Sequence, residues 1–375
     1  MLTSLLKDMA KRVIQDAIRA EVSDYINASE GDRDPLTGYR LVTRNGSYTR
    51  HYTTPMGTLE IDMPRVDDPR PDKRFISKVL PPYVRRSPTL DNVIPALYLK
   101  GISSGDMMPI LRQLIGDAQV AGLTPTTIDH LREQWYQDYL AWSKRDLSAE
   151  RYKLVWVDAL YFNLKDKERQ RVCILVMLGC TYDGRKELLA LRQGYRESTQ
   201  TWAEMIADLI SRGLSEAPEL VIADGALGIW QAVEKEWPKT LHQRCWIHKM
   251  RNVLDKLPKS VHQMAQQELR DIFVTSSDRA SAVHGLEAFI VKYAKYRPAV
   301  ESLKMDATEL FSYMDVVPLP AWSSVRSTNA IESLFSTIRQ RTKTTRGLGS
   351  PESVVAMVYT LIRSQEKRFK RVALS

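Results

Sequence analysis

Two aspartates interrupt apolar runs of this sequence at places where a carboxylate can do chemistry. Asp158 lies inside a strand-like run at 154–164, and Asp224 ends a second run at 220–223. An ionised carboxylate in an apolar strand is costly unless it is paired or binds a cation. A residue at the end of a strand in an open α/β sheet faces the crevice where ligands bind. The local alternatives are a hydrogen-bonded core aspartate at 158 and an Asp-Gly turn at 224.

Glu332 is a third candidate carboxylate, in the first turn of a helix expected at 329–342. With Asn329 it fits a capping box, in which the glutamate serves only its own helix. A second interpretation comes from the helical wheel, because one face is apolar and Glu332 shares the other with a row of cations. Contacts with a polyanion are therefore expected from Arg326, Arg339, Arg341, Lys343 and Arg346.

Three carboxylates beside a cationic row fit metal-dependent cleavage of DNA. We expect Asp158, Asp224 and Glu332 to ligate two Mg²⁺ ions, with Mn²⁺ as a substitute, because Mg²⁺ prefers oxygen ligands. Two such ions about 4 Å apart activate a water or a 3′-hydroxyl and stabilise the leaving oxygen, without a covalent protein intermediate. Cys245 and His248 supply only two ligands for zinc, so we expect them to form hydrogen bonds behind the metal ligands.

The elements that must position these residues indicate a mixed α/β sheet. Three meandering strands and then alternating helix and strand are expected, with the strands at 154–164, 171–182, 186–192, 220–224 and 240–246. This order predicts a ribonuclease H-like five-stranded sheet with flanking helices, in which the first strand lies beside the fourth. Asp158 and Asp224 would then face each other.

The whole chain is expected to contain five parts. They are an N-terminal helix and β-hairpin region (1–84), a helix-turn-helix-like DNA-binding domain (85–150), the first part of the catalytic core (151–246), an all-helical insertion domain (247–324) and the C-terminal helices of the core (325–375). The first part should hold a helix at 2–27 and turns at 45–46 and 55–57. Generic helical packing produces the same pattern as a helix-turn-helix, so this signal is weak by itself.

The charge distribution indicates a polyanionic partner. The net charge is +9, and residues 326–375, with 10 basic and 3 acidic side chains, contribute +7 of it. A localised basic stripe is typical of nucleic-acid binding, although a solvated surface helix has the same composition. Three cysteines without a Cys-x-x-Cys pair, no bilayer-length apolar run and no export signal predict a soluble, cytoplasmic protein without a membrane partner.

Several ordered motifs together resemble the Mutator-type transposases of bacterial insertion sequences, over roughly the whole chain. They are Asp158-Ala-Leu-Tyr, Gly194-Tyr-Arg-Glu-Ser198 with Trp202, Asp224-Gly-Ala-Leu-Gly-Ile-Trp230, Pro238, Gln243-Arg-Cys-Trp-Ile-His-Lys-Met-Arg-Asn-Val253 and Ser327-Thr-Asn-Ala-Ile-Glu-Ser333. The resemblance implies a ribonuclease H-like core with a DDE triad at Asp158, Asp224 and Glu332, and a helical insertion between the second and third acids. It also implies a Cys/Asp-x-x-His motif at Cys245 and His248, an N-terminal module for terminal inverted repeats and a circular DNA intermediate. The segment 101–107 lacks the arginine that the family often places there, which leaves the recognised end sequence open.

The expected function is therefore Mg²⁺-dependent DNA strand cleavage at terminal inverted repeats, with strand transfer into target DNA by a homodimer or higher oligomer. One alternative is a ribonuclease H-like nuclease or resolvase, which would cut without strand transfer. The other is a transposase-derived DNA-binding repressor with an inactive core, against which the presence of all three acids argues.

Overall fold

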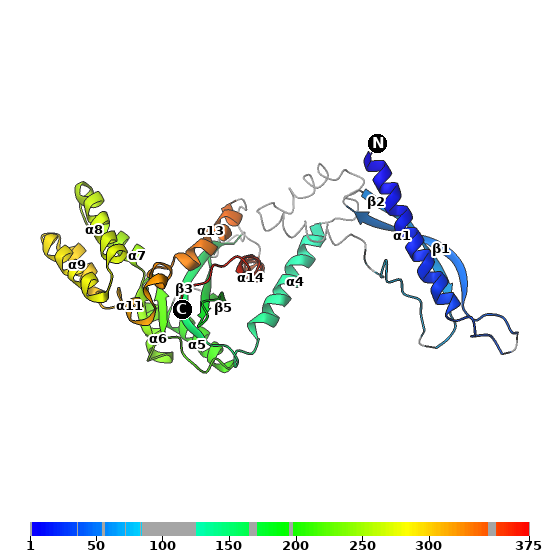
Figure 1. Cartoon of the computed structure of the whole chain (residues 1–375), viewed down its shortest axis with the longest axis horizontal. Helices are drawn as coiled ribbons and strands as arrows, with labels where there is room; N and C mark the ends of the chain where they lie inside the picture. Colours follow the sequence, from blue (N-terminus) through cyan, green and yellow to red (C-terminus); the bar gives the residue numbers. More distant parts are fainter. Residues whose placement is uncertain are drawn as a thin grey trace. The chain divides into compact units, whose positions relative to one another are not determined.

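The computed structural model of the chain describes residues 2–35, 37–54, 57–71, 73–82, 84, 125–164, 171–194, 198–343 and 350–374 (Figure 1). These residues divide into two compact units, Met1–Asp129 and His130–Ser375. The helices expected between 90 and 115, which carry the helix-turn-helix prediction, lie outside the described residues. The division of the chain into five parts stays a prediction.

The first unit is a helix packed on a hairpin. Helix α1 (Leu2–Asn27) covers strand β2 (Gly57–Asp67), which pairs antiparallel with β1 (Thr43–Thr54). Its core comprises Ile18, Leu59, Ile61, Met63 and Leu80. The helix expected at 2–27 is confirmed, but the turn expected at Asn45-Gly46 is wrong. Gly46 has a φ of 70° and lies at a register shift inside β1. Since β1 continues to pair with β2 on both sides of Gly46, the left-handed residue forms a β-bulge and does not end the strand.

The second unit is built on a mixed five-stranded sheet, as the sequence predicts. Its order is β5-β4-β3-β6-β7, with bounds β3 (Tyr152–Asn163), β4 (Arg171–Thr181), β5 (Lys186–Gly194), β6 (Leu220–Ala223) and β7 (Leu241–Arg244). Strands β3, β6 and β7 run parallel, and β4 is antiparallel to both of its neighbours. The expected pairing of the first strand with the fourth is therefore observed, as β3 beside β6.

The two faces of this sheet are covered by different helices. Val155, Val157 and Ala223 face a core that includes residues of α5 (Thr199–Ser211) and α6 (Leu227–Glu236). Helix α13 (Asn329–Lys343) contacts β3, and α14 (Pro351–Glu366) contacts β5 and α13 (Figure 1). Because successive side chains of a strand point to opposite faces, Asp158 faces away from the α5–α6 core.

A helical segment connects β7 to α13. It consists of α7 (Trp246–Leu254), η2 (Lys259–Val261), α8 (His262–Thr275), α9 (Arg279–Lys292), α10 (Arg297–Met305), α11 (Tyr313–Val316), η3 (Leu319–Ala321) and α12 (Trp322–Val325). The last strand was expected to run to 246, but Cys245 caps α7 and Trp246 begins it. Trp246 packs against Phe273 and Phe311, and its indole Nε1 donates to the Leu310 carbonyl at 2.7 Å, so packing within the segment fixes this boundary.

Helix α4 (Pro125–Ser143) precedes the sheet in sequence, and its second half packs on it. The Tyr139 hydroxyl donates to the Leu191 carbonyl of β5 at 3.0 Å, and its ring lies against Tyr359 of α14. Among the residues with a described structure, none of the helices combines the length and the apolar character that a membrane crossing demands.

Candidate active site

Asp158 lies within β3, and Asp224 directly follows the last residue of the adjacent parallel strand β6. Trp156 of β3 pairs with Ile222 of β6, and each aspartate follows two residues later. Neighbouring strands lie about 4.8 Å apart, and the alternation of side chains puts both aspartates on the face away from the α5–α6 core. Local amides orient them: Ala159 N donates to Asp158 Oδ1 at 2.7 Å, and Ala226 N donates to Asp224 Oδ1 at 3.0 Å.

The carboxyl group of Asp158 responds electrostatically to the other two acids. Burial, followed by the negative charges of Asp224 and Glu332, raises the pKa of Asp158 to about 6, although the Ala159 amide and His248 act in the opposite direction. Repulsion of this kind is relieved by a cation between the carboxylates. The structure therefore brings the three acids expected from the sequence into one electrostatic environment.

Glu332 reaches this site from the first turn of α13, which packs on β3. Its Oε1 accepts a hydrogen bond from the Thr328 hydroxyl at 2.5 Å and lies 3.8 Å from His248 Nδ1. The capping box considered for Asn329 and Glu332 is not formed, because the Asn329 amide donates to Ser327 Oγ at 3.4 Å instead. The Glu332 carboxylate is thus directed towards α7 and the ends of the central strands.

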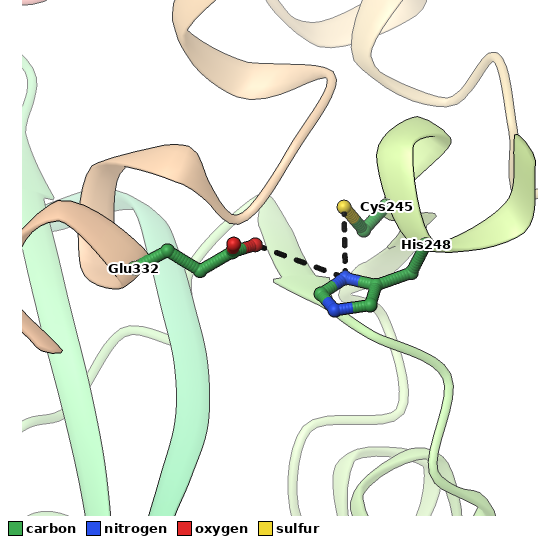
Figure 2. Close-up of side chains that lie close together, drawn as sticks. All are labelled: Cys245, His248 and Glu332. Carbon is green, nitrogen blue, oxygen red and sulfur yellow. Dashed lines mark hydrogen bonds and ion pairs between the residues drawn. The ribbon is translucent and has the colours of Figure 1, made fainter. Parts of the chain in front are cut away.

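Cys245 and His248 form a pair at the start of α7 (Figure 2). Cys245 Sγ lies 3.3 Å from His248 Nδ1, and both side chains lie near the Glu332 carboxylate. Burial raises the pKa of the Cys245 thiol, but hydrogen bonds from His248 and Thr328 outweigh it and leave this pKa lowered. The hydrogen bond to Cys245 is the main cause of the raised pKa of His248. The contact between the two side chains therefore lowers the pKa of the thiol and raises the pKa of the imidazole.

The Arg244 guanidinium lies against the glycine that follows Asp224, and sequence reasoning missed it. Gly225 has a φ of 95°, and a Cβ there would lie 2.1 Å from the Arg244 guanidinium. Arg244 Nε donates to Asp306 Oδ2 at 2.9 Å, and the same carboxylate pairs with the buried Lys249. A glycine after Asp224 is consequently required both by its conformation and by the close approach of the guanidinium.

The expected DNA-binding cations differ in how the structure presents them. Arg326 is half-buried, donates from Nη1 to the Phe273 carbonyl at 2.6 Å and stacks on the Phe273 ring at 5.1 Å. Arg339 is exposed on α13, with its guanidinium 5.9 Å from the ring centre of Phe335. The side chains of Arg341 and Lys343 and the whole of Arg346 lie outside the described part of the chain.

Comparisons with known proteins agree over most of the sequence. A family model described as "Transposase, Mutator family" matches residues 2–372. The transposase for insertion sequence element IS6120 of Mycolicibacterium smegmatis is 42% identical over 284 residues, which is 76% of this chain and 86% of the relative. The transposase for element IST2 of Acidithiobacillus ferrooxidans is 38% identical over 264 residues, or 70% of this chain and 88% of the relative. The transposase for element IS905 of Lactococcus lactis is 29% identical over 332 residues, or 88% of this chain and 81% of the relative.

Proposed function

Because this chain belongs to the Mutator family of transposases, we propose that it cleaves DNA at the terminal inverted repeats of an insertion sequence and transfers the cut strand into target DNA. In this proposal the five-stranded sheet is a ribonuclease H-like core, and the helices from α7 to α12 are an insertion domain within it. The observation that supports the proposal best is that Asp158, Asp224 and Glu332 lie close together, where burial and the charges of Asp224 and Glu332 raise the pKa of Asp158.

The three carboxylates are proposed to be the catalytic metal ligands. Asp158 and Asp224 come from rigid neighbouring strands, and Glu332 comes from the helix that packs on β3. This all-oxygen set fits two Mg²⁺ ions, or Mn²⁺ in their place, better than a soft metal. When bound, such ions supply an activated water or 3′-hydroxyl and charge stabilisation of the leaving oxygen. The protein residues hold the carboxylates in register.

We assign DNA binding to the parts of the chain outside the three carboxylates and their sheet. We place recognition of the inverted repeats in the N-terminal region and in residues 85–150, and backbone contacts on the cationic side chains around α13. Cys245 and His248 are assigned to support Glu332: they contact each other at 3.3 Å, and His248 Nδ1 lies 3.8 Å from the Glu332 carboxylate. A homodimer or higher oligomer would hold the two ends of one element together.

A strand-cleavage assay on DNA that carries the element's own ends tests this function. Cleaved and strand-transferred products are expected with Mg²⁺, and both should disappear when a chelator removes the ion, because the acids alone do not activate a water or a 3′-hydroxyl. Cleavage without strand transfer would support the nuclease or resolvase alternative. End binding without cleavage at any Mg²⁺ concentration would support the repressor.

Neutralising the cations of α13 is expected to weaken DNA binding. The double variant Arg339→Gln with Lys343→Gln should make the negative slope of log K against log salt shallower, by about 0.9 for each lost phosphate contact, because fewer counterions are released. Binding measured from 50 to 300 mM salt, on element and unrelated DNA, gives this slope. Lys235→Gln is the matched control, since Lys235 is a 70% exposed cation on α6, which covers the opposite face of the sheet. Equal slopes for the double variant and the wild type would remove α13 from the DNA-binding surface.

A further inference from the structure

Thr328 lies at the centre of the contacts around Glu332. It is fully buried just before α13. Its hydroxyl oxygen lies 2.5 Å from Glu332 Oε1, 3.2 Å from Cys245 Sγ and 3.4 Å from His248 Nδ1. The cysteine and the histidine precede it by 83 and 80 residues in the chain. One hydroxyl therefore joins the start of α7 to the first turn of α13.

The chemistry of a hydroxyl decides how this contact works. A threonine has one proton to donate and two lone pairs to accept with. The shortest contact, 2.5 Å, is to the carboxylate oxygen of Glu332, and a hydrogen bond to an ionised acceptor is stronger than one between neutral groups. The proton is therefore assigned to Glu332, and the contacts to Cys245 Sγ and His248 Nδ1 are the longer ones. Oε1 is thereby held, while the second carboxylate oxygen keeps its capacity to bind a cation.

Thr328 is itself fixed to the strand that leads to Asp224. Its amide nitrogen lies 3.4 Å from Cys245 Sγ, and the amide of Cys245 donates to the carbonyl of Ala223, the last residue of β6, at 2.9 Å. A continuous series of short contacts thus runs from Ala223 through Cys245 and Thr328 to Glu332. This series relates the position of the third carboxylate to that of the second.

An alternative interpretation of this cluster is that Cys245, His248 and Glu332 bind a soft metal ion. One ligand atom from each lies within 4.8 Å of the others, which suits a small ion. Zinc, however, needs about 2.0–2.3 Å to each ligand, and the Thr328 oxygen already lies between 2.5 and 3.4 Å from one such atom of all three residues. The space is occupied by the hydroxyl, so the hydrogen-bonded interpretation is favoured.

We infer that Thr328 is the positioning residue for Glu332, and that its hydroxyl sets the carboxylate at the distance from Asp224 that a shared divalent cation requires. This inference rests on the proposed function, in which Glu332 is a metal ligand. Removing a group that orients a metal ligand typically costs 10–100-fold in metal affinity or activity. Thr328 should therefore control metal binding by the free protein, before any DNA is added.

Mn²⁺ binding to the full chain, followed by the electron paramagnetic resonance signal of the free ion, tests this inference. Thr328→Val should weaken binding about tenfold or more, and Thr328→Ser, which keeps the hydroxyl, should stay close to the wild type. Thr240→Val is the matched control, because Thr240 is also buried and its hydroxyl donates a hydrogen bond to the Pro218 carbonyl at 2.7 Å, which the variant loses. If Thr328→Val prevents folding, Thr328→Ala removes the same hydroxyl and should weaken binding equally.

Two comparisons separate this inference from the proposed function. If Glu332→Gln leaves Mn²⁺ binding unchanged, Glu332 is no ligand and the proposed function itself fails. If Glu332→Gln weakens binding but Thr328→Val behaves as Thr240→Val does, only the positioning role is overturned. A thiolate-to-cobalt absorption band with Co²⁺ that disappears in Cys245→Ala would also overturn it, because the cluster would then be a soft-metal site.

Discussion

Asp224→Asn is expected to reduce strand cleavage about a thousandfold while binding to the element's ends is retained. Asparagine keeps the size of the side chain and an oxygen that can accept the Ala226 amide, so the turn is preserved. It removes the negative charge that would hold a divalent cation beside Asp158. A loss of about 4 kcal/mol of charge stabilisation in the transition state corresponds to about three powers of ten in rate.

The measurement pairs cleavage kinetics with end binding on the same DNA. Asp208→Asn is a suitable control, because this aspartate is 52% exposed on α5, which packs on the opposite face of the sheet. It should cleave at the wild-type rate. If Asp224→Asn lost end binding together with cleavage, the aspartate would have a structural role at the turn and would not be assigned to the chemistry.

Asp158→Asn is expected to make the metal-free protein more stable at pH 7.5. Burial and the charges of Asp224 and Glu332 raise the pKa of Asp158 to about 6, from an ordinary value of 3.8. A carboxyl group whose pKa is raised by folding favours the folded state below pH 4, and this contribution is lost as the pH rises to 6. An asparagine side chain does not ionise, so Asp158→Asn does not lose this stability as the pH rises. After allowance for solvent screening the gain is roughly 1–2 kcal/mol, or about 2–8 °C in Tm.

Thermal unfolding in a chelating buffer at pH 7.5 and pH 4 checks this expectation. The difference between Asp158→Asn and the wild type should be largest at pH 7.5 and close to zero at pH 4, where both side chains are neutral. Saturating Mg²⁺ should favour the wild type, because only the carboxylate binds the ion. Equal Tm values at pH 7.5 without metal would show that the three acids do not repel one another as their placement implies.

The sheet was predictable because its strands are apolar and bounded by turn residues. The sequence marks β4 by ten consecutive small or apolar residues after Arg171, and this strand is buried along nearly its whole length. The start of α13 at Asn329 was predicted, although the capping box considered there is not formed. The strand expected at 240–246 ran too far, since Trp246 is β-favouring in isolation and its helical state depends on packing against Leu310 and Phe311.

The candidate acids were also accessible from sequence, because each is a charge in an otherwise apolar or amphipathic pattern. Thr328 and Arg244 were not. A buried threonine beside a helix start looks like an ordinary helix cap, and two of its three side-chain partners, Cys245 and His248, lie 83 and 80 residues away. In the sequence Arg244 looks like a solvent-exposed arginine at the end of a strand. Only the fold shows that Gly225 leaves room for its guanidinium. Such roles depend on contacts between distant segments, which no local pattern records.

The shared carboxylate of Asp306 has a practical consequence for anyone who wishes to shorten this protein. Arg244 and Lys249, with side chains 8% and 5% exposed, both pair with Asp306 at the end of α10, and Lys249 also donates to the Ser302 carbonyl at 2.7 Å. Removing α8 to α10 together with Asp306, to obtain a smaller gene-delivery tool, would leave Arg244 and Lys249 buried without their carboxylate partner. Each broken pair costs about 3–5 kcal/mol of stability. A compact derivative would need neutral replacements at both positions before it could be expected to fold.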